Sequence, residues 1–219
     1  MIFKKYQPSE QEVLREEKAL TPEEETQSTE REKSFIVPEN IAYNEGSGTL
    51  LLSLGEEAAG AEEIRPAAEQ NGFEEKNEFH ITVVGFRNAA EIRKALKKFS
   101  SLERQEKIDA IGALIKDTDW KFVPEARAFR IAKEYKNPDP KHKGAEVTEH
   151  RESYIRMVHL PAMERFYGEL SNILGADIRP QPPHITLFTA GTDKEKAKGG
   201  IGINTKEELK KLIQEEISV

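Results

Sequence analysis

Hydrophobic and polar positions alternate over several short runs of the chain and predict β-strands. Other stretches carry apolar residues three or four positions apart, which is typical of helices with one buried face. The expected strands are residues 49–55, 79–86, 120–123, 128–135, 153–160 and 183–189. The expected helices are residues 56–65, 89–99, 103–116, 161–175 and 205–217, and Pro66 is expected to end the first of them. This mixture predicts an α+β fold for residues 49–219.

Two of the expected strands contain the same short motif, in which one apolar residue separates a histidine from a threonine. The motifs are His80-Ile81-Thr82 and His184-Ile185-Thr186. Side chains alternate between the two faces of a strand, so each histidine shares a face with its threonine. With five histidines and eleven threonines in the chain, one such motif is unsurprising and can be ordinary strand sequence. Two copies, both inside apolar strands, favour a shared site.

The spacing of the two motifs indicates an internal repeat. They are 104 residues apart (184 − 80), and the same offset relates the expected strands at Leu51–Leu54 and Ile155–Val158 (155 − 51). Each of these strands begins 29 residues before its histidine (80 − 51 and 184 − 155). Each half of the chain then reads strand, helix and His-x-Thr strand, which predicts two copies of one unit. Packed edge to edge, the copies would put both motifs on the walls of one cleft.

Charge is distributed unevenly along the chain. Charged residues are 33% and hydrophobic residues 37% of the 219, a polar composition that predicts some sequence outside the core. Residues 1–48 hold six Lys/Arg and eleven Asp/Glu, a net charge of −5, which leaves −7 − (−5) = −2 for the remainder. We therefore expect residues 1–48 to be an acidic N-terminal extension. The remainder lacks the broad basic surface of proteins that hold long nucleic-acid duplexes.

The chain has no cysteine, which excludes disulfides and thiolate metal sites. No run of apolar residues has the length of a signal peptide or a membrane span. These features predict a cytoplasmic protein with no membrane partner.

The paired motifs suit chemistry on a phosphodiester. Two imidazoles of near-neutral pKa can act as acid and base on opposite sides of the phosphorus atom. Two threonine hydroxyls can donate hydrogen bonds to the other phosphate oxygens and stabilise the developing charge. The rest of the chain offers no convincing cluster of carboxylates and histidines, so we expect no metal and no cofactor.

The motifs resemble the paired His-x-Thr/Ser motifs of the 2H phosphoesterase superfamily, which includes the RNA 2′,3′-cyclic phosphodiesterases, also called 2′-5′ RNA ligase-like proteins. The segment Pro182–Phe188 looks especially like the second motif of that family. The resemblance covers about residues 49–190. It implies a duplicated, two-lobed α+β fold with antiparallel sheets flanking a central cleft and helices on the outside. The spacing of 104 residues between the motifs is long for the compact bacterial members.

The resemblance also implies an activity. Members of the superfamily hydrolyse a 2′,3′-cyclic phosphate or a 2′-5′ phosphodiester in an RNA end or a small nucleotide without a metal. His80 and His184 would be the acid and the base in an order that the sequence leaves open, and Thr82 and Thr186 would assist them. A protein that binds nucleotides or RNA ends in the same cleft without turnover is the alternative. A third possibility is an interaction protein that holds its partner with residues 1–48.

Four further features are weaker candidates. Tyr154 and Arg156 would share one strand face, where Arg156 could bind a substrate phosphate or pair with a glutamate. Phe188 is expected on the face of His184, where it would stack on a base or pack in the core. The segment Gly199–Gly202 is predicted to border the cleft.

Overall fold

The structure of the protein is a computed structural model, and it describes residues 35–44, 46–138 and 146–218. Most of the predicted acidic extension, residues 1–34, lies outside this range. The described strands form one open antiparallel sheet in the order β1-β2-β4-β7-β6-β5-β8, with the short β3 paired to β7. The strands are β1 (Asn40–Asn44), β2 (Thr49–Leu54), β3 (Glu74–Glu75), β4 (Phe79–Val84), β5 (Val123–Pro138), β6 (Glu146–His159), β7 (His184–Gly191) and β8 (Ile213–Ser218). The predicted α+β class is therefore confirmed.

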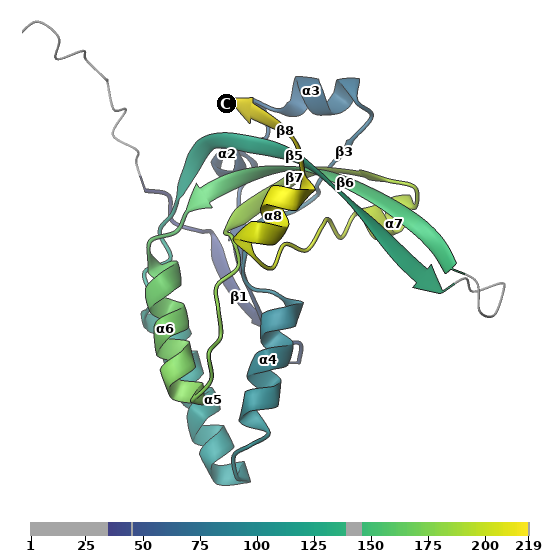
Figure 1. The fold of residues 1–219 in the computed structure, drawn as a ribbon. Coiled ribbons are helices and arrows are strands. Elements are labelled where there is room, and N and C mark those ends of the chain that lie inside the picture. Colours follow the sequence, from purple (N-terminus) through teal and green to yellow (C-terminus); the bar gives the residue numbers. More distant parts are fainter. Residues whose placement is uncertain (1–34, 45, 139–145, 219) are drawn as a thin grey trace, which may run out of the picture. The chain divides into compact units, whose positions relative to one another are not determined.

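Three long helices pack against one face of the sheet, and Figure 1 shows them grouped together. They are α4 (Phe86–Leu96), α5 (Ser101–Asp117) and α6 (Ala162–Leu174), and the shorter helices are α2 (Glu56–Ala59), α3 (Arg65–Gln70), α7 (Lys194–Ala197) and α8 (Lys206–Leu212). A capping box formed by Ser100 and Glu103 begins α5. Gly175 ends α6 at a φ of 59°, which a residue without a Cβ atom adopts at no steric cost.

The main hydrophobic core lies between these helices and the sheet. The buried side chains of β2 point into it at alternate positions, Leu50, Leu52 and Leu54, as the pleat of a strand requires. Ile81 of β4 and Ile185 of β7 reach the same core from the centre of the sheet. Residues 51 and 53, between the core positions of β2, therefore face the other side of the sheet.

A smaller core covers part of that other side. Ile155 and Met157 of β6 contact Ile201 and Ile203, together with Leu209 of α8. Only the β5–β6 part of the sheet is covered in this way, because this cluster contains no residue of β2, β4 or β7. The His-x-Thr strands thus have one face in the main core and the other beside the edge of the smaller core.

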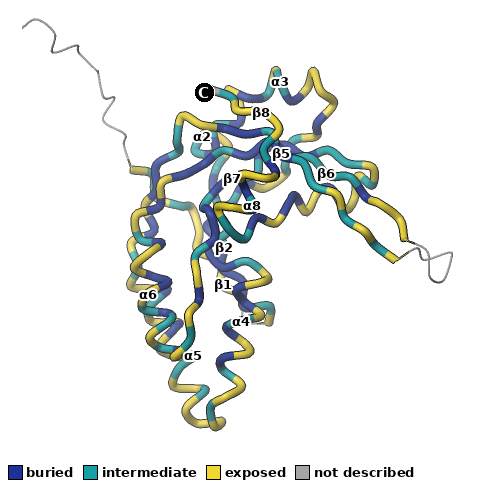
Figure 2. The backbone as a smooth tube through the Cα atoms, viewed as in Figure 1, coloured by how far each residue is buried: buried dark blue, intermediate teal, exposed yellow. Residues whose placement is uncertain are grey.

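Several element boundaries differ from the prediction. Pro66 lies at the start of α3 instead of ending a helix, because proline has the φ angle of a first helical turn. The predicted break before residue 128 is an irregularity within a single strand, β5. Phe86 begins α4 and is 78% exposed, so it does not continue β4. The outer ends of β5 and β6 are polar and become exposed toward residues 138 and 146 (Figure 2).

The sheet also begins before the boundary that we predicted at residue 48. Ile36 forms a β-bridge with Phe122, and β1 pairs along its whole length with β2. Residues 36–44 therefore belong to the folded unit that starts at Ser34. Among the described helices, none has both the length and the apolar character needed to cross a membrane.

Candidate active site

Strands β4 and β7 are neighbours at the centre of the sheet, and their register turns both His-x-Thr motifs to the same face. Ile81 lies opposite Ile185 in this antiparallel pair. Both isoleucine side chains are completely buried in the main core. The histidine and the threonine on either side of each isoleucine therefore point to the opposite face of the sheet.

All four predicted side chains gather on that face in a crossed arrangement. Continuing the register from the isoleucine pair puts His80 across from Thr186 and Thr82 across from His184. In such a pair, residues directly opposite have Cβ atoms about 5 Å apart, and diagonal neighbours lie about 7–8 Å apart. The two imidazoles are diagonal neighbours, and so are the two hydroxyls. A phosphate group between them would have an imidazole on each side and a hydroxyl on each side.

His184 has its ring orientation fixed by the chain that precedes it. Its Nδ1 atom lies 2.8 Å from the carbonyl oxygen of Pro182, and the side chain is 8% exposed. A carbonyl oxygen can only accept a hydrogen bond, so Nδ1 carries a proton and Nε2 of the neutral ring keeps its lone pair. Burial lowers the pKa of His184; the bond to Pro182 opposes this, and the nearby His80 adds to it.

His80 is more open than His184 and has a cation beside it. Partial burial lowers the pKa of His80, the ammonium of Lys76 lowers it further, and Glu78 acts in the opposite direction. Lys76 is itself half-buried, and its Nζ atom donates a hydrogen bond to the carbonyl oxygen of Lys198. None of the ion pairs formed by the described residues involves Lys76. Glu78 acts on Lys76 electrostatically without forming an ion pair with it, so this half-buried ammonium is a suitable contact for an anion.

Sequence reasoning missed Lys76. The residue reaches the site because β3 pairs with β7 and the backbone N–H of Lys76 donates to the carbonyl oxygen of Leu187, just beyond the second motif. Asn77 and Glu78 then bridge from β3 to β4. The only available signal was a lysine four positions before His80, which has no meaning until the pairing of β3 is known.

The segment around Gly200 borders the site on the side of Thr186. A Cβ atom on Gly200 would lie 3.5 Å from the Cγ2 atom of Thr186, and the residue has a φ of 71°. Arg151 donates to the carbonyl oxygen of Gly200 at 3.4 Å. A side chain at this position would meet Thr186 at an ordinary van der Waals distance, so the positive φ, and not a lack of space, favours glycine here. The predicted position of Gly199–Gly202 beside the site agrees with these contacts.

A hollow of about 560 Å³ opens beside His80, between β1–β2 and the segment that joins β3 to β4. His80 and Lys76 line it at one end. Ser53, which pairs with His80 across β2 and β4, contributes a hydroxyl to its wall. The volume lies within the range of about 300–1,000 Å³ that small-molecule sites occupy.

The weaker candidates Arg156, Tyr154 and Phe188 do not join this group. Arg156 forms an ion pair of 2.8 Å with Glu63 and donates to the carbonyl oxygen of Glu125, so the glutamate alternative describes it correctly. Tyr154 is 1% exposed and packs in the main core, where its ring lies 4.6 Å from that of Phe73. The structure thus gives both residues contacts within the protein instead of a substrate-facing position.

Phe188 packs in the main core, which confirms one of its two predicted alternatives, but it does not share the face of His184 as expected. The cause is a register shift between β6 and β7: Ile155 pairs with Thr186, whereas the preceding Tyr154 pairs with Phe188. Two residues of β7 therefore match one residue of β6, and the strand's alternation is reversed beyond the shift. Phe188 is 1% exposed and lies under the guanidinium of Arg65.

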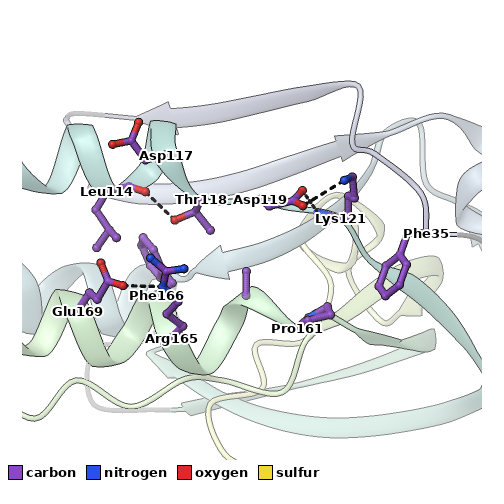
Figure 3. A pocket seen from close by; sticks show the side chains of 11 residues that line it. Phe35, Leu114, Asp117, Thr118, Asp119, Lys121, Pro161, Arg165, Phe166 and Glu169 are labelled. Carbon is purple, nitrogen blue, oxygen red and sulfur yellow. Dashed lines mark hydrogen bonds and ion pairs between the residues drawn. The ribbon is translucent and has the colours of Figure 1, made fainter.

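Another hollow, of about 480 Å³, lies between the end of α5 and the start of α6 (Figure 3). Ion pairs between Arg165 and Glu169 and between Lys121 and Asp119 cross its wall. None of the residues that line it belongs to β4 or β7.

Within the described ranges, no three His, Asp or Glu side chains are grouped so as to bind a metal ion. No protein-family model, curated protein or solved structure matches the chain.

Proposed function

We propose that the protein is a phosphodiesterase of the 2H type that hydrolyses the 2′,3′-cyclic phosphate of a nucleotide or RNA end without a metal ion. One observation carries the proposal: two His-x-Thr pairs lie crossed on the shared face of β4 and β7. The half-buried ammonium of Lys76 beside His80 supports an anionic substrate. A 2′-5′ phosphodiester would present the same phosphate chemistry to the same groups.

In the proposed reaction, water attacks the phosphorus atom and gives a proton to Nε2 of His184. The P–O bond to one ribose oxygen breaks on the opposite side, and that oxygen takes a proton from His80. The product is a nucleoside 2′- or 3′-monophosphate. We assign the base to His184 because its Nδ1–H is held by Pro182, which leaves Nε2 ready to accept a proton. Thr82 and Thr186 donate hydrogen bonds to the remaining phosphate oxygens.

We also propose that the two halves of the sheet are copies of one unit, as the implied two-lobed fold requires. β2 leads through helices to β4, and β6 leads through α6 to β7. In the sheet, β2 flanks β4 and β6 flanks β7. On each side of the β4–β7 pair, the strand with the His-x-Thr motif is therefore followed outward by the strand that precedes it in its own half of the chain. A cleft between two lobes would then follow this central pair.

Hydrolysis of 2′,3′-cyclic AMP by the purified full-length protein in the presence of EDTA tests the proposed activity. We expect formation of adenosine monophosphate, identified by ³¹P NMR, at a rate that EDTA leaves unchanged. An activity lost in EDTA and restored by a divalent cation would overturn the metal-independent mechanism. Binding of the nucleotide without product, across cyclic nucleotides and short RNAs with cyclic ends, would favour the binding protein instead.

The pH dependence of kcat/KM should reflect the lowered pKa values of both histidines. The base must be unprotonated and the acid protonated, so kcat/KM falls below the pKa of His184 and above the pKa of His80. Burial lowers both pKa values, and Lys76 lowers that of His80 further. We therefore expect a bell-shaped profile with its maximum below about pH 6.5, the ordinary value for histidine, with two apparent pKa values that belong to the pair.

Replacing Lys76 with methionine should move the alkaline limb of this profile to higher pH, because the pKa of His80 rises when the neighbouring ammonium is removed. The maximal kcat/KM should fall by about 10- to 100-fold, the usual effect of losing a hydrogen bond to a charged group. Lys97→Met removes an exposed charge from the C-cap position of α4 and is the matched control. An unchanged alkaline limb in Lys76→Met would show that Lys76 does not act on His80.

A further inference from the structure

The hollow beside His80 carries an unusual balance of charge. Its wall includes one ammonium, that of Lys76, and four carboxylates. The carboxylates belong to Glu39, Glu56, Glu75 and Glu78. Arg65 pairs with two of them, Glu56 and Glu75. Glu39 and Glu78 take part in no ion pair among the described residues.

The single ammonium and the carboxylate of Glu39 occupy different parts of the hollow, whereas the carboxylate of Glu78 lies near Lys76 and His80. Lys76 lies at the end that reaches His80. Glu39 lies at the far end, where its backbone N–H donates to the carbonyl oxygen of Ser53 and its side chain passes over Gly55, within 2.6 Å of where a Cβ atom would be. Two strand spacings, about 10 Å, separate β4 from the chain at Glu39. A nucleoside attached to a phosphate at His80 spans a comparable length.

We propose that this hollow binds the nucleoside of the substrate and selects nucleotides that carry no second phosphate. The inference rests on the proposed function and adds its substrate class: a mononucleoside 2′,3′-cyclic phosphate with a free 5′-hydroxyl. Lys76 neutralises the one phosphate at the histidines. A 5′-phosphate would lie near the unpaired carboxylate of Glu39, where like charges repel. An RNA chain extending from that position would meet the same repulsion.

A second hollow offers the opposite selectivity and defines the competing outcome. It has a volume of about 520 Å³ and lies on the side of His184, lined by Pro182 and Pro183 together with α8. Lys206 and Lys210 of α8 line it and form no ion pair with any described residue. A nucleoside bound there would direct its 5′-phosphate toward these ammonium groups. The acidic hollow is favoured because His80 is part of its wall, whereas neither His80 nor His184 lines the second hollow.

The test compares 2′,3′-cyclic AMP with the same nucleotide carrying a 5′-phosphate, using the full-length protein. We expect the 5′-phosphate to lower kcat/KM by about tenfold or more. Glu39→Gln, which keeps the shape of the side chain and removes its charge, should reduce this ratio by about threefold or more. Raising the salt concentration should reduce it as well, because salt screens the repulsion.

Two control variants distinguish the hollows. Glu106→Gln removes an exposed charge from α5 and should leave both substrates and their ratio unchanged. Lys210→Gln should also leave the ratio unchanged. Faster turnover of the 5′-phosphorylated substrate, with the gain lost in Lys210→Gln, would move the nucleoside to the second hollow and overturn the inference. Equal turnover of the two substrates would also overturn it, whereas turnover of neither would instead overturn the proposed function.

Discussion

Replacing His184 with alanine is expected to lower kcat for a nucleoside 2′,3′-cyclic phosphate by about 10²- to 10⁴-fold, the range typical of a general acid or base. The hydrogen bond to Pro182 keeps the proton of this ring on Nδ1. The lone pair of Nε2 is therefore free to accept a proton from the attacking water. Alanine removes that lone pair without adding charge. The KM should change little, because the histidine acts mainly in the transition state.

His80→Ala should give a loss of similar size, and the double variant should be barely slower than either single one. Acid and base act together in one transition state, so their losses do not multiply. Steady-state kinetics of the three variants measures this relation. His159→Ala is the matched control, because His159 is exposed at the end of β6. Wild-type turnover in either His80→Ala or His184→Ala would remove that residue from the mechanism.

The pattern around the two histidines could be predicted from the sequence because it depends only on the strand period. Ile81 and Ile185 had to be buried, and period-two alternation then puts each histidine and threonine on the opposite face. The pairing of β4 with β7 was a less direct inference, drawn from the repeat and the resemblance. The structure has these strands as neighbours.

The face of the strand on which Phe188 lies could not be predicted correctly, because it depends on a partner strand. The register shift between β6 and β7 reverses the alternation after Thr186, and nothing in the local sequence of β7 marks that point. Lys76 was missed for a related reason, since its position follows from two residues of β3 that pair with β7. In both cases the pairing of distant strands decides where a side chain points. For Phe188 this overrides the local alternation, and for Lys76 the local sequence gives no pattern at all.

The C-terminal segment shows a different source of error. Ile213 and Ile217 were assigned to a helix because they are four residues apart, but this spacing is also compatible with a strand, in which a register shift against β5 places the two side chains at different cores. The chain leaves α8 after Leu212 and forms β8, with Ile217 packed against the main core and Ile213 against the smaller one. Pairing with the edge of β5 stabilises the extended form.

Replacing Ile185 with alanine is expected to lower the free energy of unfolding by about 2–5 kcal/mol, the range for large-to-small substitutions in a core. Ile185 is completely buried in the apolar main core, where a cavity left by the lost atoms would offer a water molecule few hydrogen-bond partners. Urea denaturation followed by circular dichroism measures the change. Leu102→Ala is the control, because Leu102 of α5 is 73% exposed and its loss should cost about 0.5 kcal/mol or less.

The conservative variant Ile185→Val separates stability from the geometry of the site. It removes one methylene and keeps the β-branched shape, so it should cost only about 0.5–1.5 kcal/mol and preserve the strand. Because Ile185 acts by holding the register opposite Ile81, the activity per folded molecule should stay close to that of the wild type. If Ile185→Ala were no less stable than Leu102→Ala, the isoleucine pair would not hold β4 and β7 together. The common face of the two histidines would then lose its physical basis.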